Sequence, residues 1–172
     1  MEHVTYTDQE FPIEISHPTT WEAIEGFAGT HVSFFSPREG KRDKFRDYMC
    51  LITVEFLNPA LDLLAEFSER SITELGKQLN NFKVVEPLSD AELSGYPAKQ
   101  VTYHHEEGEL KLVTYNVWTI RESDYVAYAL GGIAQRKDFD KYIPIFKDMI
   151  ASFKILGDYE DGQFYELKKQ TE

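Results

Sequence analysis

The first half of the chain alternates apolar and polar residues in short runs separated by turn residues. Residues 11–15 alternate in this way and stop before Pro18, whose ring favours an extended or turn geometry at His17. Val32–Phe35 is a second run, closed by a Ser-Pro pair, and residues 48–56 form a third that is long enough to be a central strand. The pattern predicts three strands before residue 57.

The period changes at Asn58 and Pro59, which are suited to the cap and the first position of a helix. Apolar residues then fall near one face at helical spacing, and the pattern predicts a helix over residues 60–80. The members of this face are Leu61, Leu64, Ile72, Leu75 and Leu79.

From residue 82 to residue 133 the period returns to that of strands. Turn residues at 94–95, 106–108 and 122–124 separate the runs, and such short links make neighbouring strands antiparallel. Residues 82–86 and 91–93 are predicted as two short strand segments before the first of these turns.

These strands carry apolar residues on both faces, since Leu112 and Trp118 share one parity while Val113 and Tyr115 share the other. A sheet with one wet face does not need this pattern, so both faces are expected to be covered. The helix predicted over 60–80 is expected to cover one face. The other face is expected to be covered by a helix predicted over 138–152, capped at Asp138 or Asp140 and with Pro144 near its first turn. Its apolar stripe contains Phe139, Tyr142, Ile143, Phe146, Met149, Ile150 and Phe153. The predicted fold class is α+β, an antiparallel β-sheet sandwiched between α-helices.

Four stretches occur in a characteristic order: FPIEISHPTTW (11–21), FFSP (34–37), LSGYPAKQVTY (93–103) and IPIFKDMIASFKI (143–155). Together they resemble the PsbP-like family, relatives of the extrinsic photosystem II subunit whose fold is shared with a small Ran-binding nuclear import factor. The resemblance spans about residues 10–156. It implies a PsbP-like α/β/α domain over 1–156, followed by an acidic, amphipathic extension over 157–172.

The resemblance also implies proteins that bind other proteins instead of catalysing reactions, and it supplies no transferable active site. Bacterial and archaeal relatives of unknown function are the closer match, because the chain as written has no leader for a lumenal photosystem role. The expected partner is therefore another protein, and a homodimer is left open.

Net charge narrows the choice of partners. The formal net charge of −12 and the pI near 4.9 oppose binding to nucleic acid or to anionic lipid, because both require a basic face. One segment departs from this balance, since residues 37–47 hold five basic and three acidic residues. It is either a solvated loop between strands or a docking patch for an acidic partner. Its basic residues are Arg38, Lys41, Arg42, Lys44 and Arg46.

The single cysteine, Cys50, excludes an intrachain disulfide and is predicted to be a buried, inert thiol on a strand. No apolar run is long enough for a membrane span, and the polar N-terminus is unlike a signal peptide. The chain as written is expected to be cytoplasmic, or exported if a leader has been removed. Phosphate-binding loops, zinc-type motifs and a nucleophile elbow are all missing from the sequence, so we expect neither catalysis nor a cofactor, although a hydrolase assembled in space is not excluded.

The stretch YHHEEGE (103–109) is the strongest candidate for chemistry. On a strand His104 and Glu106 face the same way, and two ligands are too few for a tight zinc site without a third. The same residues fit the tip of a hairpin in which Gly108 has a positive φ.

Two functions follow. The first is a non-catalytic protein-binding or accessory module. The alternative is a small-ligand or metal-ion carrier that uses a cleft beside the sheet, with Tyr103, Tyr115 and Trp118 as its walls.

Overall fold

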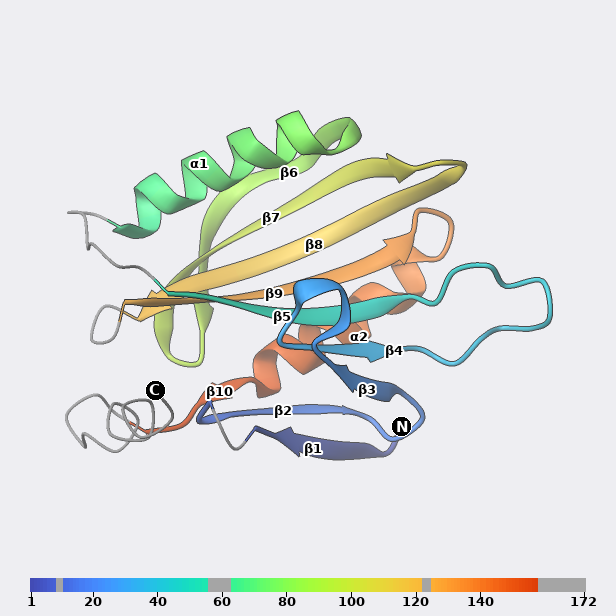
Figure 1. Cartoon of the computed structure of the whole chain (residues 1–172), viewed down its shortest axis with the longest axis horizontal. Helices are drawn as coiled ribbons and strands as arrows, with labels where there is room; N and C mark the ends of the chain where they lie inside the picture. The colour runs from blue at the N-terminus through green and yellow to red at the C-terminus, as the bar shows by residue number, and fades with distance from the viewer. Residues whose placement is uncertain (9–10, 56–62, 122–124, 158–172) are drawn as a thin grey trace.

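The structure is a computed structural model that describes residues 1–8, 11–55, 63–121 and 125–157. Its main layer is a seven-stranded, fully antiparallel sheet (Figure 1). In spatial order the strands are β3 (Glu22–Glu25), β4 (Val32–Phe35), β5 (Tyr48–Glu55), β9 (Val126–Gln135), β8 (Leu110–Arg121), β7 (Tyr96–Glu107) and β6 (Asn80–Leu93). The two predicted strands at β4 and β5 are confirmed, because four and eight residues of these runs pair in the sheet.

A second sheet of three strands lies beside the first, in the order β1 (His3–Thr7), β2 (Ile13–Pro18) and β10 (Lys154–Ile155). The predicted strand at 11–15 is displaced by two residues and extends through Pro18, where the strand ends. β1 and β10 were not predicted from the sequence, because β1 is mostly exposed and β10 has only two residues.

Helix α1 (Leu63–Gln78) covers one face of the sheet over β6, β7 and β8. Its apolar side packs on Val101, Tyr103 and Trp118, and the indole Nε1 of Trp118 donates to Ser68 Oγ at 2.7 Å. The predicted helix over 60–80 is confirmed within the described residues. Its predicted cap at residues 58–59 lies outside them.

Helix α2 (Phe139–Ser152) covers the opposite face, so the predicted sheet between two helices is confirmed. Tyr142, Phe146, Met149 and Ile150 of its predicted stripe are buried. The helix begins after Asp138, and Pro144 lies in its second turn instead of the first.

Of the three predicted turns between strands, two lie in the described residues, and they differ in how well they were predicted. Ser94 and Gly95 form the first turn as expected, both with positive φ. The second turn was predicted at 106–108, but β7 continues through Glu107 and the turn is Gly108 and the next residue. The consecutive residues Glu106 and Glu107 do not end the strand, because both pair with β8 and Glu106 is opposite Lys111. Gly108 has a φ of 58°, as predicted. The turn at 122–124 and residues 158–172 of the extension lie outside the described residues.

Strand β6 is one continuous edge strand of 14 residues instead of the two short segments predicted. Its register with β7 shifts three times between Asn80 and Ser89. The shifts explain the broken apolar alternation that suggested two segments, because each shift changes which residues face α1.

Candidate functional site

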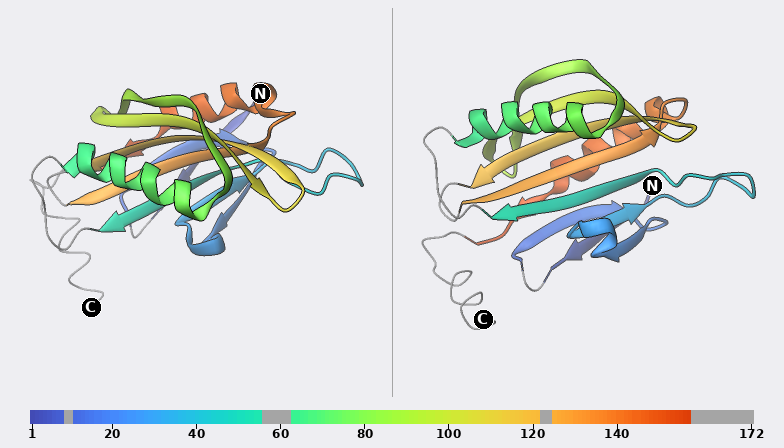
Figure 2. Two further views of the ribbon diagram at one scale, coloured as in Figure 1. Left: turned by 90° about the horizontal axis from the view of Figure 1, so that it is seen from above. Right: turned by 45° about the horizontal axis from the view of Figure 1, so that its top comes forward.

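The sheet face that carries α1 is only half covered by helix. Of the two described α-helices, α1 lies over β6 to β8 and α2 lies on the other face (Figure 2). At β3, β4 and β5 the only described helix on this face is the short 3-10 helix η1 (Phe27–Gly29), whose Phe27 packs on Phe35. Apolar side chains are exposed there: Phe27 keeps 45% of its surface, and Ile52 and Val54 each keep 40%. Large exposed apolar side chains that gather on one face mark interaction surfaces.

An aromatic floor lies at one end of this open face. The ring centroids of Phe27 and Phe35 are 5.0 Å apart, those of Phe35 and Tyr48 are 5.1 Å apart, and those of Phe45 and Tyr48 are 6.0 Å apart. Strand alternation produces this floor, since Phe35 and Tyr48 are directly paired neighbours of β4 and β5. The floor belongs to a groove of about 380 Å³. We call this the aromatic groove; its lining residues are Ile24, Phe27, Phe35, Arg38, Lys44, Phe45, Arg46, Tyr48 and Glu107.

The basic segment predicted from the sequence borders this groove. Residues 36–47 form the β4–β5 loop, which projects beyond the end of the sheet (Figure 1). Arg46 has a structural role: its guanidinium lies 5.2 Å from the centre of the Phe35 ring, donates to Ser36 O and forms an ion pair with Glu22 at 2.8 Å. The guanidinium of Arg38 donates to the backbone of Asp43.

The acidic residues of the loop are held by internal contacts. The Asp43 carboxylate accepts from the backbone N–H groups of Glu39 and Phe45. Glu39 accepts from the Tyr142 hydroxyl at 2.8 Å, and it also pairs with Lys141. These contacts direct both carboxylates toward the protein.

Asp47, at the end of the loop, is buried, and its Oδ1 accepts from the backbone N–H of Gln135 at 2.9 Å. Burial raises the pKa of this carboxyl to about 6. Lys41, Arg42 and Lys44 have no acidic partner among the residues that the structure describes, and all three are exposed. The loop therefore presents uncompensated positive charge beside the aromatic groove.

The metal candidates His104 and Glu106 do face the same way, but no third ligand joins them among the described residues. Glu106 accepts from the side-chain amide of Asn81 at 2.6 Å. Partial burial and the nearby cations of Arg136 and Lys83 lower the pKa of His104. The part of the chain that the structure describes contains no group of three or more His, Cys, Asp or Glu side chains that can hold a metal.

The three aromatic residues expected to wall a cleft lie on opposite faces of the sheet. Tyr103 and Trp118 pack under α1, whereas Tyr115 belongs to the core on the α2 side and donates its hydroxyl to Gln100 at 2.8 Å. Tyr115 and Trp118 are an odd number of residues apart on β8, so their side chains point in opposite directions. The prediction that they share one cleft is wrong.

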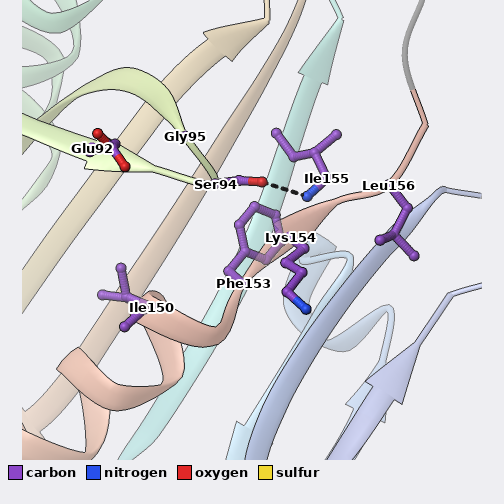
Figure 3. Close-up of a pocket in the computed structure, with 9 residues that line it drawn as sticks. Glu92, Ser94, Gly95, Ile150, Phe153, Lys154, Ile155 and Leu156 are labelled. Atoms are coloured by element: carbon purple, nitrogen blue, oxygen red, sulfur yellow. Dashed lines mark hydrogen bonds between the residues drawn. The ribbon is translucent and has the colours of Figure 1, made fainter.

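A different cavity does lie beside the sheet, between the β6–β7 turn and the segment that follows α2 (Figure 3). It holds about 550 Å³, and its lining mixes the apolar Ile150, Phe153 and Leu156 with the polar Glu92, Ser94 and Lys154. Ser94 Oγ accepts from the backbone N–H of Ile155 at 2.8 Å at its edge. No pattern in the sequence indicated this cavity, because its two walls are far apart in the chain.

Comparisons with known proteins place the fold. No family model and no curated protein sequence matches the chain. Solved structures do match: cyanobacterial PsbP (CyanoP) from Synechocystis sp. PCC 6803 has a TM-score of 0.65 at 14% identity, over 90% of this chain and 92% of that one. LpqN of Mycobacterium tuberculosis has a TM-score of 0.67 at 14% identity, over 91% of each chain. The chain has the PsbP-like fold.

A third PsbP-like match is the Ran-binding protein Mog1p of Saccharomyces cerevisiae, with a TM-score of 0.59 at 10% identity over 90% of this chain and 96% of that one. LpqN is described as involved in cell envelope biogenesis, whereas Mog1p binds Ran. One fold thus serves different roles, so function has to be argued from the surface of this chain. Neither described helix is long and apolar enough to cross a membrane.

Proposed function

We propose that this PsbP-like chain is a non-catalytic accessory module that binds an acidic segment of a partner protein through the β4–β5 loop and the aromatic groove. The proposal rests on one observation: the acidic side chains of the loop have partners within the protein, whereas among the described residues three of its basic side chains have none. Its carboxylates bind the protein's own groups, while Lys41, Arg42 and Lys44 are exposed without acidic partners in the described part of the chain.

The groove and the loop suit two parts of one ligand. An apolar side chain of the partner packs against Phe35, Phe45 and Tyr48, where burial of an aromatic or aliphatic group provides affinity. Carboxylates beside it face the lysines and the arginine of the loop. Because the rest of the chain is strongly acidic, an acidic partner is repelled elsewhere, and charge selects both the orientation and the site of binding.

The test compares two charge-reversal variants that change the net charge equally. K41E/R42E/K44E reverses the loop, and R70E/K77E/K83E reverses exposed cations on α1 and β6 as the matched control. Partners captured by each full-length chain from cells of the native source are quantified by mass spectrometry, and binding of the purified partner is then measured by calorimetry at rising salt.

We expect the loop variant to lose at least about tenfold in affinity, since several charge contacts of roughly 0.5–1 kcal/mol each are reversed. The control should bind as the wild type does, and binding should weaken with salt. Equal affinity of the loop variant and the wild type contradicts the proposal.

An apolar variant tests the groove separately. Phe27 is exposed, so F27S is expected to leave the fold intact while removing part of the groove wall. A fall in partner affinity with an unchanged melting temperature supports the groove. Unchanged affinity restricts the interface to the loop.

The cavity beside Ser94 favours a second candidate function, the binding of a small amphipathic ligand, because its lining combines apolar side chains such as Ile150 and Leu156 with the charged side chains of Glu92 and Lys154. A thermal-shift screen of amphipathic small molecules tests it. Stabilisation by a ligand should disappear when I150W fills the cavity, and a screen without any stabilising ligand counts against this function.

A further inference from the structure

A second cationic surface lies at the end of β8 and β9, on the sheet face that carries α2. Arg136 follows β9, and its backbone N–H donates to Lys111 O at 2.8 Å, which extends the ladder by one residue. Strand alternation then places Arg136 and Lys111 on one face, together with His104 of β7 and Lys83 of β6. Basic side chains from four neighbouring strands therefore gather on a chain that is acidic overall.

A cavity of about 440 Å³ opens at this place. Three cations line it, Lys111, Arg136 and Lys137, against the single carboxylate of Glu109. Leu110 and Gln135 complete its lining.

Arg136 is half-buried, and its guanidinium has no acidic partner among the described residues. Its Nε is buried without a hydrogen-bond acceptor in that part of the chain. A buried N–H donor of a charged group costs free energy when it has no hydrogen-bond acceptor. A ligand oxygen that binds Arg136 is therefore expected to be held more strongly than one at an ordinary surface arginine.

The acidic groups nearby only partly offset these cations. Glu106 stands opposite Lys111 in the ladder, and its carboxylate accepts from Asn81. Asp138 lies 3.8 Å from Lys137 and is the residue before α2. The excess positive charge reaches the neighbouring His104, whose pKa is lowered first by its partial burial and then by Arg136 and Lys83.

We propose that this cavity binds a phosphate group, with the guanidinium of Arg136 as the main donor and the ammonium groups of Lys111 and Lys137 at its rim. A guanidinium offers a fork of N–H donors that matches two oxygens of an oxyanion, and several cations around one cavity favour a dianion over a single carboxylate. The phosphate is either free or carried by a small molecule, and both present the same three oxygens.

The site is distinct from the proposed partner groove, because its cations Lys111 and Arg136 lie on the opposite face and no residue lines both cavities. The cations near His104, Arg136 and Lys83, favour an anion over a metal ion at this place.

The experiment measures the melting temperature of the full-length chain in inorganic phosphate, phenyl phosphate, succinate and chloride at equal ionic strength. Phosphate at a hundredfold of its Kd should raise Tm by about 5 °C or more over chloride. Phenyl phosphate that binds more tightly than phosphate identifies a carried phosphate group, and equal or weaker binding identifies the free ion.

Variants assign the effect to the cavity. R136Q is expected to weaken phosphate binding at least about tenfold and K111Q to weaken it by a smaller factor, while R70Q, the same change at an exposed arginine of α1, leaves it unchanged. In ¹H–¹⁵N spectra phosphate should raise the pKa of the His104 ring in the wild type but not in R136Q, because the bound anion offsets the nearby cations.

Three results overturn the proposal: equal Tm in phosphate and chloride, wild-type phosphate affinity in a folded R136Q, or tighter binding of succinate than of phosphate. Should R136Q fail to fold, K111Q and the His104 titration still decide, since an unchanged pKa of His104 in saturating phosphate also overturns it.

Discussion

At the scale of single residues, Asp47 anchors the end of the β4–β5 loop. Its carboxylate accepts from Gln135 N–H, and its carbonyl oxygen accepts from Ser36 N–H at 2.8 Å, so one residue holds both ends of the loop and the neighbouring strand. Only 3% of its surface is exposed, and burial raises its pKa from 3.8 to about 6.

This shift makes stability depend on pH. The folded chain binds a proton at Asp47 below about pH 6, whereas the unfolded chain binds it only below 3.8. Between these values the folded state holds more protons, so the free energy of unfolding falls as pH rises, by about 2–3 kcal/mol in total. The D47N substitution keeps the acceptor oxygen and removes the charge. The free energy of unfolding of D47N should therefore rise relative to that of the wild type by about 2–3 kcal/mol as the pH increases from about 4 to about 7.5.

Urea unfolding of both chains across this range measures the difference. Parallel stability curves for the wild type and D47N would show that Asp47 keeps an ordinary pKa when folded. The exposed ion pair of Lys77 with Glu74 on α1 provides the control, since E74Q should leave the pH difference unchanged.

The sequence predicted the burial of single residues better than the pairing of their charges. Cys50 is buried as its strand position indicated, and burial raises its thiol pKa to about 11. The cations of the basic loop were also evident from the sequence. That they are uncompensated was not, because Glu39 is held by Tyr142, which is 103 residues away. Local charge counts cannot show which carboxylates a distant helix will bind.

At the scale of elements, the contact between α2 and the sheet depends on Gly132. A Cβ at this position would lie 2.4 Å from the Phe146 ring, closer than any real contact. Phe146 is fully buried, so the ring cannot move aside into solvent. The close approach of the Phe146 ring thus explains why β9 has a glycine at position 132.

We expect G132A to destabilise the fold by about 1–3 kcal/mol, because an added methyl group in a packed core forces side chains off their preferred rotamers. G76A on α1 is the control: its new Cβ would meet only ordinary contacts, and alanine favours a helix. Chemical unfolding of both variants measures the effect. A G132A chain as stable as the wild type would mean that α2 shifts on the sheet at little cost, and partial recovery in G132A/F146L would confirm the clash.

Element type was predicted better than element boundaries. The apolar parity of β8 correctly indicated two covered faces, because that rule depends only on alternation. The same alternation excluded one cleft containing both Tyr115 and Trp118. The turn after β7 was misplaced because Glu106 and Glu107 are polar residues that remain in the ladder, and polar residues mark turns only where no partner strand holds them.

At the scale of the whole molecule, the sheet separates two apolar cores. Val101 belongs to the core under α1, and Met149 belongs to the core on the α2 side. Side chains on opposite faces of a sheet do not touch, so each core should respond to substitution without the other.

We expect V101A and M149A to cost about 1–4 kcal/mol each and to add within about 0.5 kcal/mol in the double variant. Denaturant unfolding of the four chains completes the cycle. A coupling above about 1 kcal/mol would show that the sheet transmits packing changes between its faces. M149A combined with F153A, which removes two side chains of one core, should deviate from additivity and so acts as the positive comparison.

The repeated register shifts of β6 have a consequence for how copies of this chain behave at high concentration. An edge strand normally offers a straight row of backbone donors and acceptors onto which another strand can add. Here Val85 is 47% exposed on that edge, yet it lies within one of the shifts, between Val84 and Glu86, and Pro87 removes a donor close by. A second molecule cannot match such an irregular row, so the longest strand of the described chain resists the edge-to-edge growth that leads to fibrils.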